Sequence, residues 1–540
     1  MPTSSLSEAG APAALKMLAL VIVLAPFAAA VCAFAFRKYP RLINGITLGF
    51  SLVSLVASMA AASWVVERGY PVQFPYFSLY LDALSIYFVL LVNLVALFAS
   101  YYSIQFLEFD RDHNKHHSPA LFHFFLNMFH MTMLLVPMVD NLVVLWISIE
   151  LTTVFSTILV RYRRDRLSLE AAWKFIMITT TGIIFALLGT LFMANSVPLK
   201  LLNNEAIGPM NWSFLVSQGI PAVLNDDYVR LSFLFILLGY GTKAGLAPMH
   251  TWLPDGHGQA PAPVSALLSG VMLKSALYAI LRFYTITNLS LDDQAEFTSN
   301  LLMAAGLLSL VLATPFILKR NRFKRVLAYH SLEHMGIITF GIGIGTQVAL
   351  FAALLHALNH ALTKALMFLV HGSIQYEYIN RCGAEYGEGG EESRIQGVLK
   401  AMPVSGTLLA FGGLALVGSP PFNIFMSEFM ILWAAVQEAG LRGDLRSWLA
   451  VLLFILTVTL IFAGLVGHLS RILLGTAPFK PVEPSLRCVR TVFPFVVLIA
   501  IITLFGLLLP GWPVDFPAIL AKSAQIVQGG ASGATAVRLP

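Results

Sequence analysis

Six ionisable side chains lie inside strongly apolar stretches of this 540-residue sequence, where their chemistry would be the binding and release of protons. A charged side chain at the centre of a membrane helix costs roughly 2.5–3.5 kcal/mol, so six cost on the order of 15–20 kcal/mol before any pairing. Buried charges of this kind usually mark an ion path, which we favour over the alternative that they only pair and hold helices together. The six residues are Glu150, Lys174, Lys243, Lys274, Lys364 and Glu428.

Two histidines extend one of these lysines into a ladder. In the segment "LLHALNHALTKALMF", His356, His360 and Lys364 are four residues apart, which places all three on one face of a helix. Histidine titrates near neutral pH, so this spacing predicts a proton wire. A lone membrane histidine is more often a hydrogen-bonded core residue, and the ladder is what favours the functional interpretation.

A second polar group occurs in "AYHSLEHMG", where His330, Glu333 and His334 lie one to two turns from the predicted cytoplasmic end of a helix. These residues could admit protons to the path, or they could be the hydrogen-bonded residues of a helix end. The sequence leaves both interpretations open. The same holds for His123 and His130.

Two apolar helices are interrupted beside the charges. The segment "LGYGTKAGLAPMHTWLPDGHG" contains Lys243 and then breaks, and "VGSPPFN" comes just before Glu428. Proline removes a backbone donor and frees carbonyls that hydrocarbon cannot satisfy, so such breaks are tolerated where they line a wet or protein-filled cavity. Breaks in corresponding places of two halves indicate a transport site. The residues predicted to line the first break or to admit protons there are His250, Asp255 and His257.

The elements that position these residues are membrane helices. The chain is 57% hydrophobic and 11% charged, against roughly 25% charged in a soluble domain, and long apolar runs recur throughout. We therefore predict an all-α polytopic membrane protein with about fourteen spans. They cover residues 14–36, 43–66, 82–107, 119–138, 140–160, 170–195, 229–249, 263–286, 299–318, 324–344, 348–371, 400–437 (interrupted), 447–469 and 491–510.

Four units follow from these spans. Residues 1–118 hold the first three helices, and residues 489–540 hold the last helix with a short Gly/Ala-rich tail that offers little core material. Residues 119–286 and 299–474 each hold five helices, with the broken spans 7 and 12 among them. One unit begins on an even span and the other on an odd span, so the two are predicted to be inverted repeats.

The basic residues predict the orientation. Loops after odd-numbered spans hold 21 Lys and Arg residues, and loops after even-numbered spans hold 5. The excess of positive charge places the odd loops in the cytoplasm and both termini outside, in the inner membrane of a bacterium. Arg282, near the outer end of span 8, is expected to extend its charge to the membrane surface.

Several kinds of chemistry are not predicted for this chain. Its cysteines, Cys32, Cys382 and Cys488, are far apart and form no CxxC pair, which argues against an iron–sulfur or structural zinc site. We find no Walker loop and no dinucleotide fingerprint. We therefore expect no cofactor, no metal, no catalytic redox site and no nucleic-acid partner, with any redox chemistry in another polypeptide.

Several segments resemble one family in the same order along the chain. The stretch from "KAGLAPMHTWLPDGHG" to "KSALYAILRF", together with "DNLVVLWISIELTTVFSTILV", "HSLEHMGIITFG" and "HALNHALTKALMF", is similar to the antiporter-like proton-channel subunits of respiratory complex I. The phrases "SLEAAWKFI", "YHSLEHMGIITFGIG" and "GSPPFNIFMSEFMIL" resemble most the F-type membrane subunit of hydrogenase-4 and formate hydrogenlyase complexes. The resemblance covers about residues 80–440. The short tail differs from the long lateral helix of the largest complex I subunit.

The resemblance implies fourteen helices, two inverted five-helix repeats and a central axis of hydrated polar residues. It also implies roles for individual residues. The family's key glutamate falls on Glu150, its span-7 lysine on Lys243 and its relay residue on Lys274. The remaining positions that match family motifs are Lys174, His356, His360, Lys364 and Glu428.

These observations predict a proton-translocating subunit of a multi-subunit redox complex, with other membrane subunits and a peripheral hydrogenase- or dehydrogenase-like protein as partners. Lys243 would hold or release a proton according to its distance from Glu150. The predicted route runs from the cytoplasm through Lys243, Lys274 and the histidine ladder to Glu428. Alternatives are a subunit of a multi-subunit cation/proton antiporter, a proton-driven partner of inorganic-carbon uptake and, disfavoured by the buried charges, a passive membrane anchor.

Overall fold

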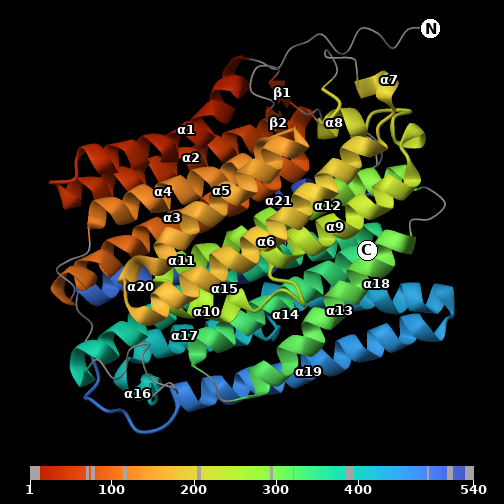
Figure 1. The fold of residues 1–540 in the computed structure, drawn as a ribbon. Coiled ribbons are helices and arrows are strands. Elements are labelled where there is room, and N and C mark those ends of the chain that lie inside the picture. The colour runs from red at the N-terminus through yellow and green to blue at the C-terminus, as the bar shows by residue number, and fades with distance from the viewer. Residues whose placement is uncertain are drawn as a thin grey trace.

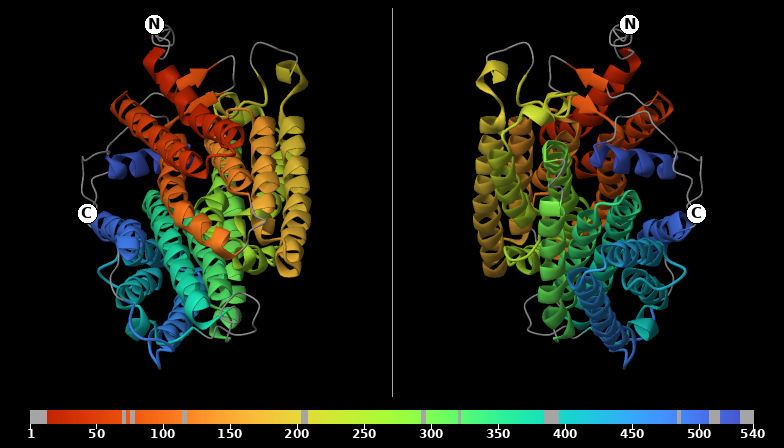
Figure 2. Two further views of the ribbon diagram at one scale, coloured as in Figure 1. Left: turned by 90° about the vertical axis from the view of Figure 1, so that its left-hand side faces the viewer. Right: turned by 90° about the vertical axis from the view of Figure 1, so that its right-hand side faces the viewer.

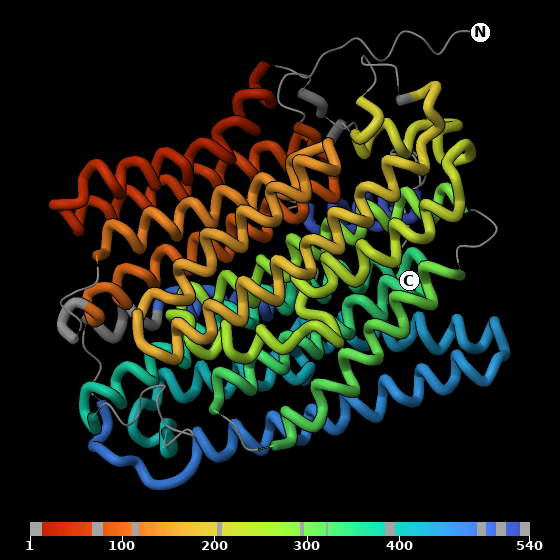
Figure 3. Tube along the Cα trace, viewed as in Figure 1, coloured from red at the N-terminus to blue at the C-terminus, as the bar shows by residue number. Residues whose placement is uncertain are grey.

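The protein is described by a computed structural model that covers residues 13–68, 72–74, 79–113, 118–202, 208–291, 296–319, 322–383, 395–482, 486–506 and 515–529. Helices account for most of this part of the chain and run side by side in one bundle (Figures 1 and 3). Eleven described helices are long and apolar enough to cross a membrane. The fold is therefore the predicted all-α membrane fold, while the total of fourteen spans and the division into four units stay predictions.

Two helices, α1 (Ala13–Ala35) and α2 (Pro40–Arg68), lie at one edge of the bundle. Figure 2 shows these helices on the opposite side of the molecule from α19 (Leu445–Leu473). A short antiparallel pair, β1 (Val72–Phe74) and β2 (Leu79–Leu81), precedes α3 (Ala83–His113). Since α3 is buried along most of its length, the N-terminal helices belong to the same core as the rest.

The middle of the chain supplies the next set of elements. Its longer helices are α4 (Pro119–Leu135), α5 (Leu142–Val160), α6 (Arg166–Ser196), α9 (Asp226–Ala244) and α12 (Leu273–Ser290). Its shorter elements are η2 (Val136–Met138), η3 (Arg161–Arg163), α7 (Leu199–Leu202), α8 (Trp212–Leu215), η4 (Pro221–Val223), α10 (Trp252–Gln259), α11 (Ala262–Leu267) and the π-helical turn η5 (Leu268–Met272).

The second half continues with α13 (Glu296–Leu318), α14 (Phe323–Ile344) and the long α15 (Gln347–Cys382). The elements that follow are α16 (Val398–Ala401), α17 (Pro403–Leu416), α18 (Asn423–Arg442), α19, α20 (Leu486–Gly506) and α21 (Phe516–Val527). α8 lies near one end of the bundle and α16 near the other (Figure 1).

Both predicted helix breaks are present. α9 ends at Ala244, where Gly245 takes a left-handed conformation (φ 77°), and the chain restarts as the short α10. α17 and α18 are separated by residues 417–422, in which Gly418 is also left-handed (φ 67°). Glycine adopts this conformation without a steric penalty, so it ends a helix where the sequence requires a sharp turn.

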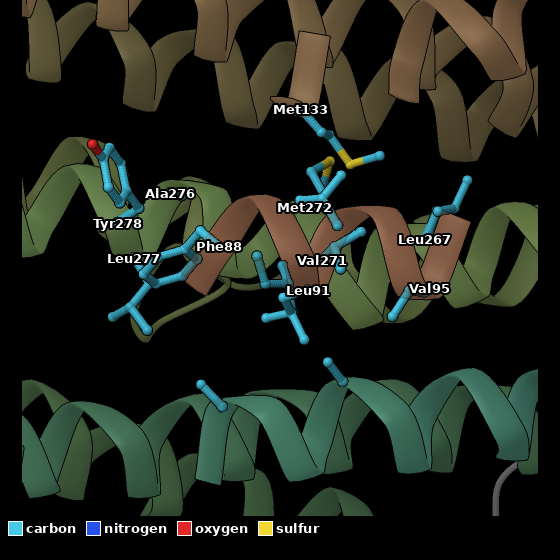
Figure 4. Packing of buried hydrophobic residues seen from close by; sticks show 14 of the residues in the cluster. Phe88, Leu91, Val95, Met133, Leu267, Val271, Met272, Ala276, Leu277 and Tyr278 are labelled. Atoms are coloured by element: carbon cyan, nitrogen blue, oxygen red, sulfur yellow. The ribbon is translucent and has the colours of Figure 1, made fainter. Parts of the chain in front are cut away.

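The densest part of the core surrounds α11, η5 and α12. Figure 4 shows Leu91 and Val95 of α3 close to Val271 of η5, and Phe88 of α3 close to Leu277 of α12. Every residue of α11 and η5 is buried, and so is α15 from Ala349 to Gly372. The polar side chains carried by these helices are thereby removed from lipid and held between protein elements.

The prediction that Arg282 extends its charge to the membrane surface is wrong. Its side chain is only 2% exposed and forms a bidentate ion pair with Asp82, with Nη1–Oδ2 and Nη2–Oδ1 distances of 2.7 and 2.8 Å. The guanidinium also lies 4.0 Å from the ring centroid of Trp212 and receives support from Tyr278 and Ser85. Asp82 precedes Arg282 by 200 residues, so the fold alone brings the partners together.

The chain after the last predicted span also differs from expectation. Residues 516–527 form α21, and its apolar side chains, including Ile519, Leu520 and Val527, are buried. Lys522 donates a hydrogen bond to the Val66 carbonyl, and α21 packs against α3, α12 and α15. This segment therefore contributes to the core, because its apolar residues recur at helical spacing. Residues 530–540 lie outside the described residues.

Candidate functional site

A first polar group is formed by Lys243, Glu150 and two threonines. Lys243, in the last turn of α9, is 1% exposed, and its Nζ donates to Thr153 Oγ1 at 2.5 Å. Thr153 Oγ1 donates in turn to Glu150 Oε2 at 3.3 Å, and Thr180 Oγ1 donates to Glu150 Oε1 at 2.9 Å. The predicted lysine–glutamate pair is thus connected through a hydroxyl group, and both ends of the link can exchange a proton.

Helix packing determines this geometry. Glu150 and Thr153 are three residues apart on α5, so they share one face of that helix. α6 and α9 can approach closely because Gly239 has no side chain. A Cβ at this position would lie only 2.3 Å from the Ala186 backbone nitrogen. The two threonines were not singled out from the sequence, since threonine is common in apolar helices and only the neighbouring glutamate hints at a polar contact.

A second group begins at Lys274 on α12. Its Nζ lies 2.5 Å from His360 Nδ1 and 2.7 Å from the Ser269 carbonyl oxygen. Within the π-turn η5, the backbone N–H of Leu273 bonds to the Leu268 carbonyl. In an α-helix that N–H would bond to Ser269 instead. The turn therefore leaves the Ser269 carbonyl available to accept from Lys274, and π-turns of this kind are frequent at functional sites.

The second group continues through three histidines to a glutamate. The rings of His360 and His334 have centroids 4.7 Å apart, and His334 Nδ1 lies 2.9 Å from His356 Nε2. His334 Nδ1 is also 4.0 Å from Glu428 Oε1. The structure thus brings Lys274, His334, His356, His360 and Glu428 together, from four helices, into one connected group.

Polar residues near the beginning of α18 support this group. His356 Nδ1 lies 2.9 Å from Ser427 Oγ, and Asn359 Nδ2 donates to the same oxygen at 3.1 Å. Asn423 Nδ2 donates to Asn359 Oδ1 at 2.7 Å, which attaches the start of α18 to α15. These three residues were missed by sequence reasoning, although Ser427 directly precedes Glu428 and Asn359 directly precedes His360.

His330, Glu333 and Lys364 lie at the other side of His334. His330 Nδ1 and Glu333 Oε2 are 2.6 Å apart and both side chains are buried. Lys364 Nζ donates to the Leu327 carbonyl at 2.6 Å. This contact joins α15 to α14, in addition to the contact between His356 and His334. The ring centroids of His330 and His334 lie 6.2 Å apart, which places the His330 pair beside the second group.

The segment between α9 and α11 places its polar residues in different surroundings. His257 is fully buried, and neither of its ring nitrogens has a hydrogen-bond partner within the described ranges. His250 is also largely buried. Asp255, by contrast, forms ion pairs with Lys174 at 3.1 Å and Arg325 at 2.9 Å, and so connects α10 to α6 and α14.

Three predicted residues lie apart from the two groups. The Lys174 side chain is 47% exposed and also pairs with Glu170 at 2.7 Å, so it is not buried as Lys243 is. His123 Nε2 lies 2.8 Å from Asn44 Oδ1, and His130 Nε2 lies 2.9 Å from Asn93 Oδ1. Both histidines are therefore buried and hydrogen-bonded, as expected for structural residues.

The two groups are not joined to each other by hydrogen bonds between described side chains. Near both groups, Ser156 Oγ on α5 lies 3.9 Å from the Met272 Sδ of η5. Lysine, imidazole, hydroxyl and carboxylate groups can each accept and return a proton. The described residues that could hold a metal ion are also here, in the sets His330–Glu333–His334 and His334–His356–Glu428.

Comparisons with known proteins show sequence similarity over most of the chain. The family model described as "NADH:quinone oxidoreductase/Mrp antiporter, TM" matches residues 139–461. The hydrogenase-4 component F homolog of Methylacidiphilum infernorum is 36% identical over 429 residues, which cover 79% of this chain and 85% of that protein.

Solved structures share the fold. A chain of the archaeal membrane-bound sulfane sulfur reductase superposes with a TM-score of 0.77 at 22% identity, covering 96% of this chain and 98% of that one. A chain of the Mrp complex from Dietzia sp. DQ12-45-1b gives a TM-score of 0.77 at 17% identity, with coverage of 95% and 97%.

Proposed function

Because the chain belongs to the NADH:quinone oxidoreductase/Mrp antiporter family, we propose that it carries protons across a bacterial inner membrane as one subunit of a larger complex. Its energy would come from a peripheral redox partner of the hydrogenase or dehydrogenase kind. The observation that carries the proposal is the connected group from Lys274 through His360, His334 and His356 towards Glu428. Groups of this kind buried at membrane depth are expensive and usually functional.

The two groups would carry out successive steps of proton transfer. Lys243 holds a proton while Glu150 is charged and linked to it through Thr153, and it releases that proton when the link is broken or Glu150 is neutralised. The proton then passes to Lys274, whose contact with His360 begins the imidazole series. Glu428, 14% exposed, is the exit of the path. We place the loops after odd spans in the cytoplasm and both termini outside.

A second candidate function is cation/proton antiport within a multi-subunit complex. The fold likeness to a chain of the Mrp complex is the observation that favours it. The two functions differ in partners and in ion dependence, because an antiporter requires a counter-cation for proton movement and a redox pump requires electron transfer.

The test is proton uptake by the whole complex, purified through this chain and reconstituted into proteoliposomes. We expect a hydrogenase- or dehydrogenase-like partner to copurify and its substrate to drive proton uptake. Lys274→Ala is expected to abolish uptake without preventing assembly, and Lys480→Ala, at an exposed loop lysine, serves as the matched control. Uptake that depends on sodium but not on the redox substrate would favour the antiporter. Full uptake in Lys274→Ala would contradict the path through Lys274, whereas the absence of uptake by the unaltered complex under either condition would contradict both functions.

A further inference from the structure

Three side chains from three helices converge beside the break between α17 and α18. His334 of α14, His356 of α15 and Glu428 of α18 each offer one donor atom, and these atoms all lie within 4.8 Å of one another. His334 Nδ1 is 2.9 Å from His356 Nε2 and 4.0 Å from Glu428 Oε1. We propose that these residues form a binding site for a transition-metal ion of the Zn²⁺ class, and that its occupation interrupts the proton chain.

The donor set selects the class of ion. Two imidazole nitrogens and one carboxylate oxygen suit Zn²⁺ and its neighbours, whereas Na⁺, Mg²⁺ and Ca²⁺ favour oxygen ligands. Tetrahedral Zn²⁺ with bonds of about 2.0–2.2 Å holds its ligand atoms roughly 3.3 Å apart. The distances of 2.9 and 4.0 Å from His334 Nδ1 lie on either side of that value. Small side-chain rotations therefore suffice to form the site, and its fourth position is left for a solvent molecule.

The surroundings orient the ligands towards one point. Ser427 Oγ contacts Nδ1 of His356, which leaves Nε2 of that ring directed at His334. Such contacts by the second nitrogen are the usual support of a metal-bound histidine. A Cβ at Gly418 would lie 2.3 Å from Glu428 Oε2, so the glycine of the helix break is what leaves room for the carboxylate.

The site is buried but not closed. His334 and His356 have no exposed surface, while the Glu428 side chain is 14% exposed. An ion would therefore arrive past Glu428. Binding requires neutral imidazoles and an ionised carboxylate, so a bound ion occupies the nitrogen lone pairs through which His334 and His356 would exchange a proton. This blocking effect rests on the proposed function, whereas binding itself does not.

Binding is tested on the full-length chain in nanodiscs, with Co²⁺ as a spectroscopic probe displaced by Zn²⁺. We expect one ion per chain and the visible absorption of low-coordinate Co²⁺. Glu428→Gln and His334→Gln, which remove a ligand, should weaken Zn²⁺ binding by on the order of 100-fold or more, and Ser427→Ala, which removes a supporting contact, by roughly 10–100-fold. His123→Gln is the matched control at a distant buried histidine and should bind normally.

The variant His330→Gln distinguishes this site from the neighbouring set His330–Glu333–His334. Zn²⁺ binding that survives in both Glu428→Gln and His334→Gln would overturn the proposal. So would binding that is lost in His330→Gln but retained in Glu428→Gln, because the ion would then lie in the other set.

The blocking effect is tested with the whole complex in proteoliposomes. Zn²⁺ is expected to stop proton uptake at the concentration that fills the site, and Ser427→Ala, normalised to its own metal-free rate, should shift that concentration by the factor measured for binding. Unchanged uptake at saturating Zn²⁺ would overturn the block. Absence of uptake before Zn²⁺ is added would contradict the proposed function instead, and the binding titration would still decide the metal site.

Discussion

At the scale of single residues, hydroxyl and imidazole groups connect the buried charged side chains to one another. Thr153 lies between Lys243 and Glu150, so the interaction of the two charged residues depends on a side chain that carries no charge. The carboxylate has a second donor in Thr180, so it remains hydrogen-bonded when Thr153 turns away. A lysine with a movable bridge to its carboxylate can be switched by a small change in side-chain position.

The bridge predicts the effect of Thr153→Val, which keeps the shape of the side chain and removes its hydroxyl. Proton uptake by the complex should fall by about 10- to 100-fold, the factor that corresponds to the roughly 1.5–3 kcal/mol of a hydrogen bond to a charged group. Thr157→Val, whose hydroxyl donates to the Thr153 backbone carbonyl on the same helix, is the matched control. Equal uptake in the two variants would contradict the role of the bridge.

Replacement of the charged partners tests whether they form a switch or only hold helices together. Lys243→Ala should assemble and transport no protons, because Glu150 can take up a proton and remain in place as a neutral acid. The double variant Glu150→Lys, Lys243→Glu keeps opposite charges but moves the cation onto α5. A purely structural pair predicts restored uptake in the double variant, and a switch predicts normal assembly without uptake in the same proteoliposome assay.

At the scale of helices and turns, irregular elements carry the site. The break after Ala244 ends α9 directly beyond Lys243, the π-turn η5 frees the Ser269 carbonyl for Lys274, and the break before α18 brings Glu428 to His334. Each of these elements would be a defect in a purely structural membrane helix, because unpaired backbone groups are costly in hydrocarbon. Their occurrence beside the buried charges therefore supports a functional origin.

The buried Asp82–Arg282 pair, which joins two distant segments of the chain, should contribute more to stability than a partly exposed ion pair. Arg282→Leu leaves Asp82 buried without its cation and should destabilise the protein by about 3–5 kcal/mol. Glu438→Gln, which removes the partly exposed ion-pair partner of Arg442, should cost only ~0–1 kcal/mol. The yield of folded protein and its thermal unfolding in detergent measure both. A loss for Arg282→Leu no larger than that for Glu438→Gln would show that the buried pair contributes little.

At the scale of the whole molecule, the second half holds the longer connected group and the first half holds the lysine–threonine–glutamate group. Asp255 bridges the halves, since its partners Lys174 and Arg325 lie on α6 and α14. The α10 segment therefore contacts both halves. The protein is a multi-span subunit of a respiratory-type membrane complex.

Orientation in the membrane is predicted by the distribution of basic residues. After replacement of the native cysteines, Arg164→Cys should react with an impermeant thiol reagent only from the cytoplasm, and Gln218→Cys only from outside. Both positions are exposed, so accessibility does not limit the reaction. Labelling of the two sites from the same side would refute the orientation.

The absence of a recognisable redox motif predicts the behaviour of the purified chain. On its own it should show no hydrogenase, dehydrogenase or quinone reductase turnover, and these activities should appear only in the complex. Turnover by the isolated chain, measured with the same electron donors and acceptors, would mean that a catalytic centre is present in this polypeptide.

The membrane class, both helix breaks and most members of the two polar groups can be recognised from the sequence alone. These properties are local: an apolar run of about 20 residues must be helical to satisfy its backbone in lipid, and a charge or proline within it is visible at once. The ladder of His356, His360 and Lys364 follows from helical spacing alone. The family resemblance added the roles of Glu150 and Lys243.

Which of these residues contact one another can be seen only in the tertiary structure. Sequence spacing could not reveal that Arg282 pairs with Asp82, that Lys174 faces outward, or that His334 and His356 converge with Glu428. Such contacts join helices that are far apart in the chain, and their geometry depends on how small residues let helices approach. The three proposed metal ligands come from three helices and share no local pattern, so their convergence was not predicted from the sequence.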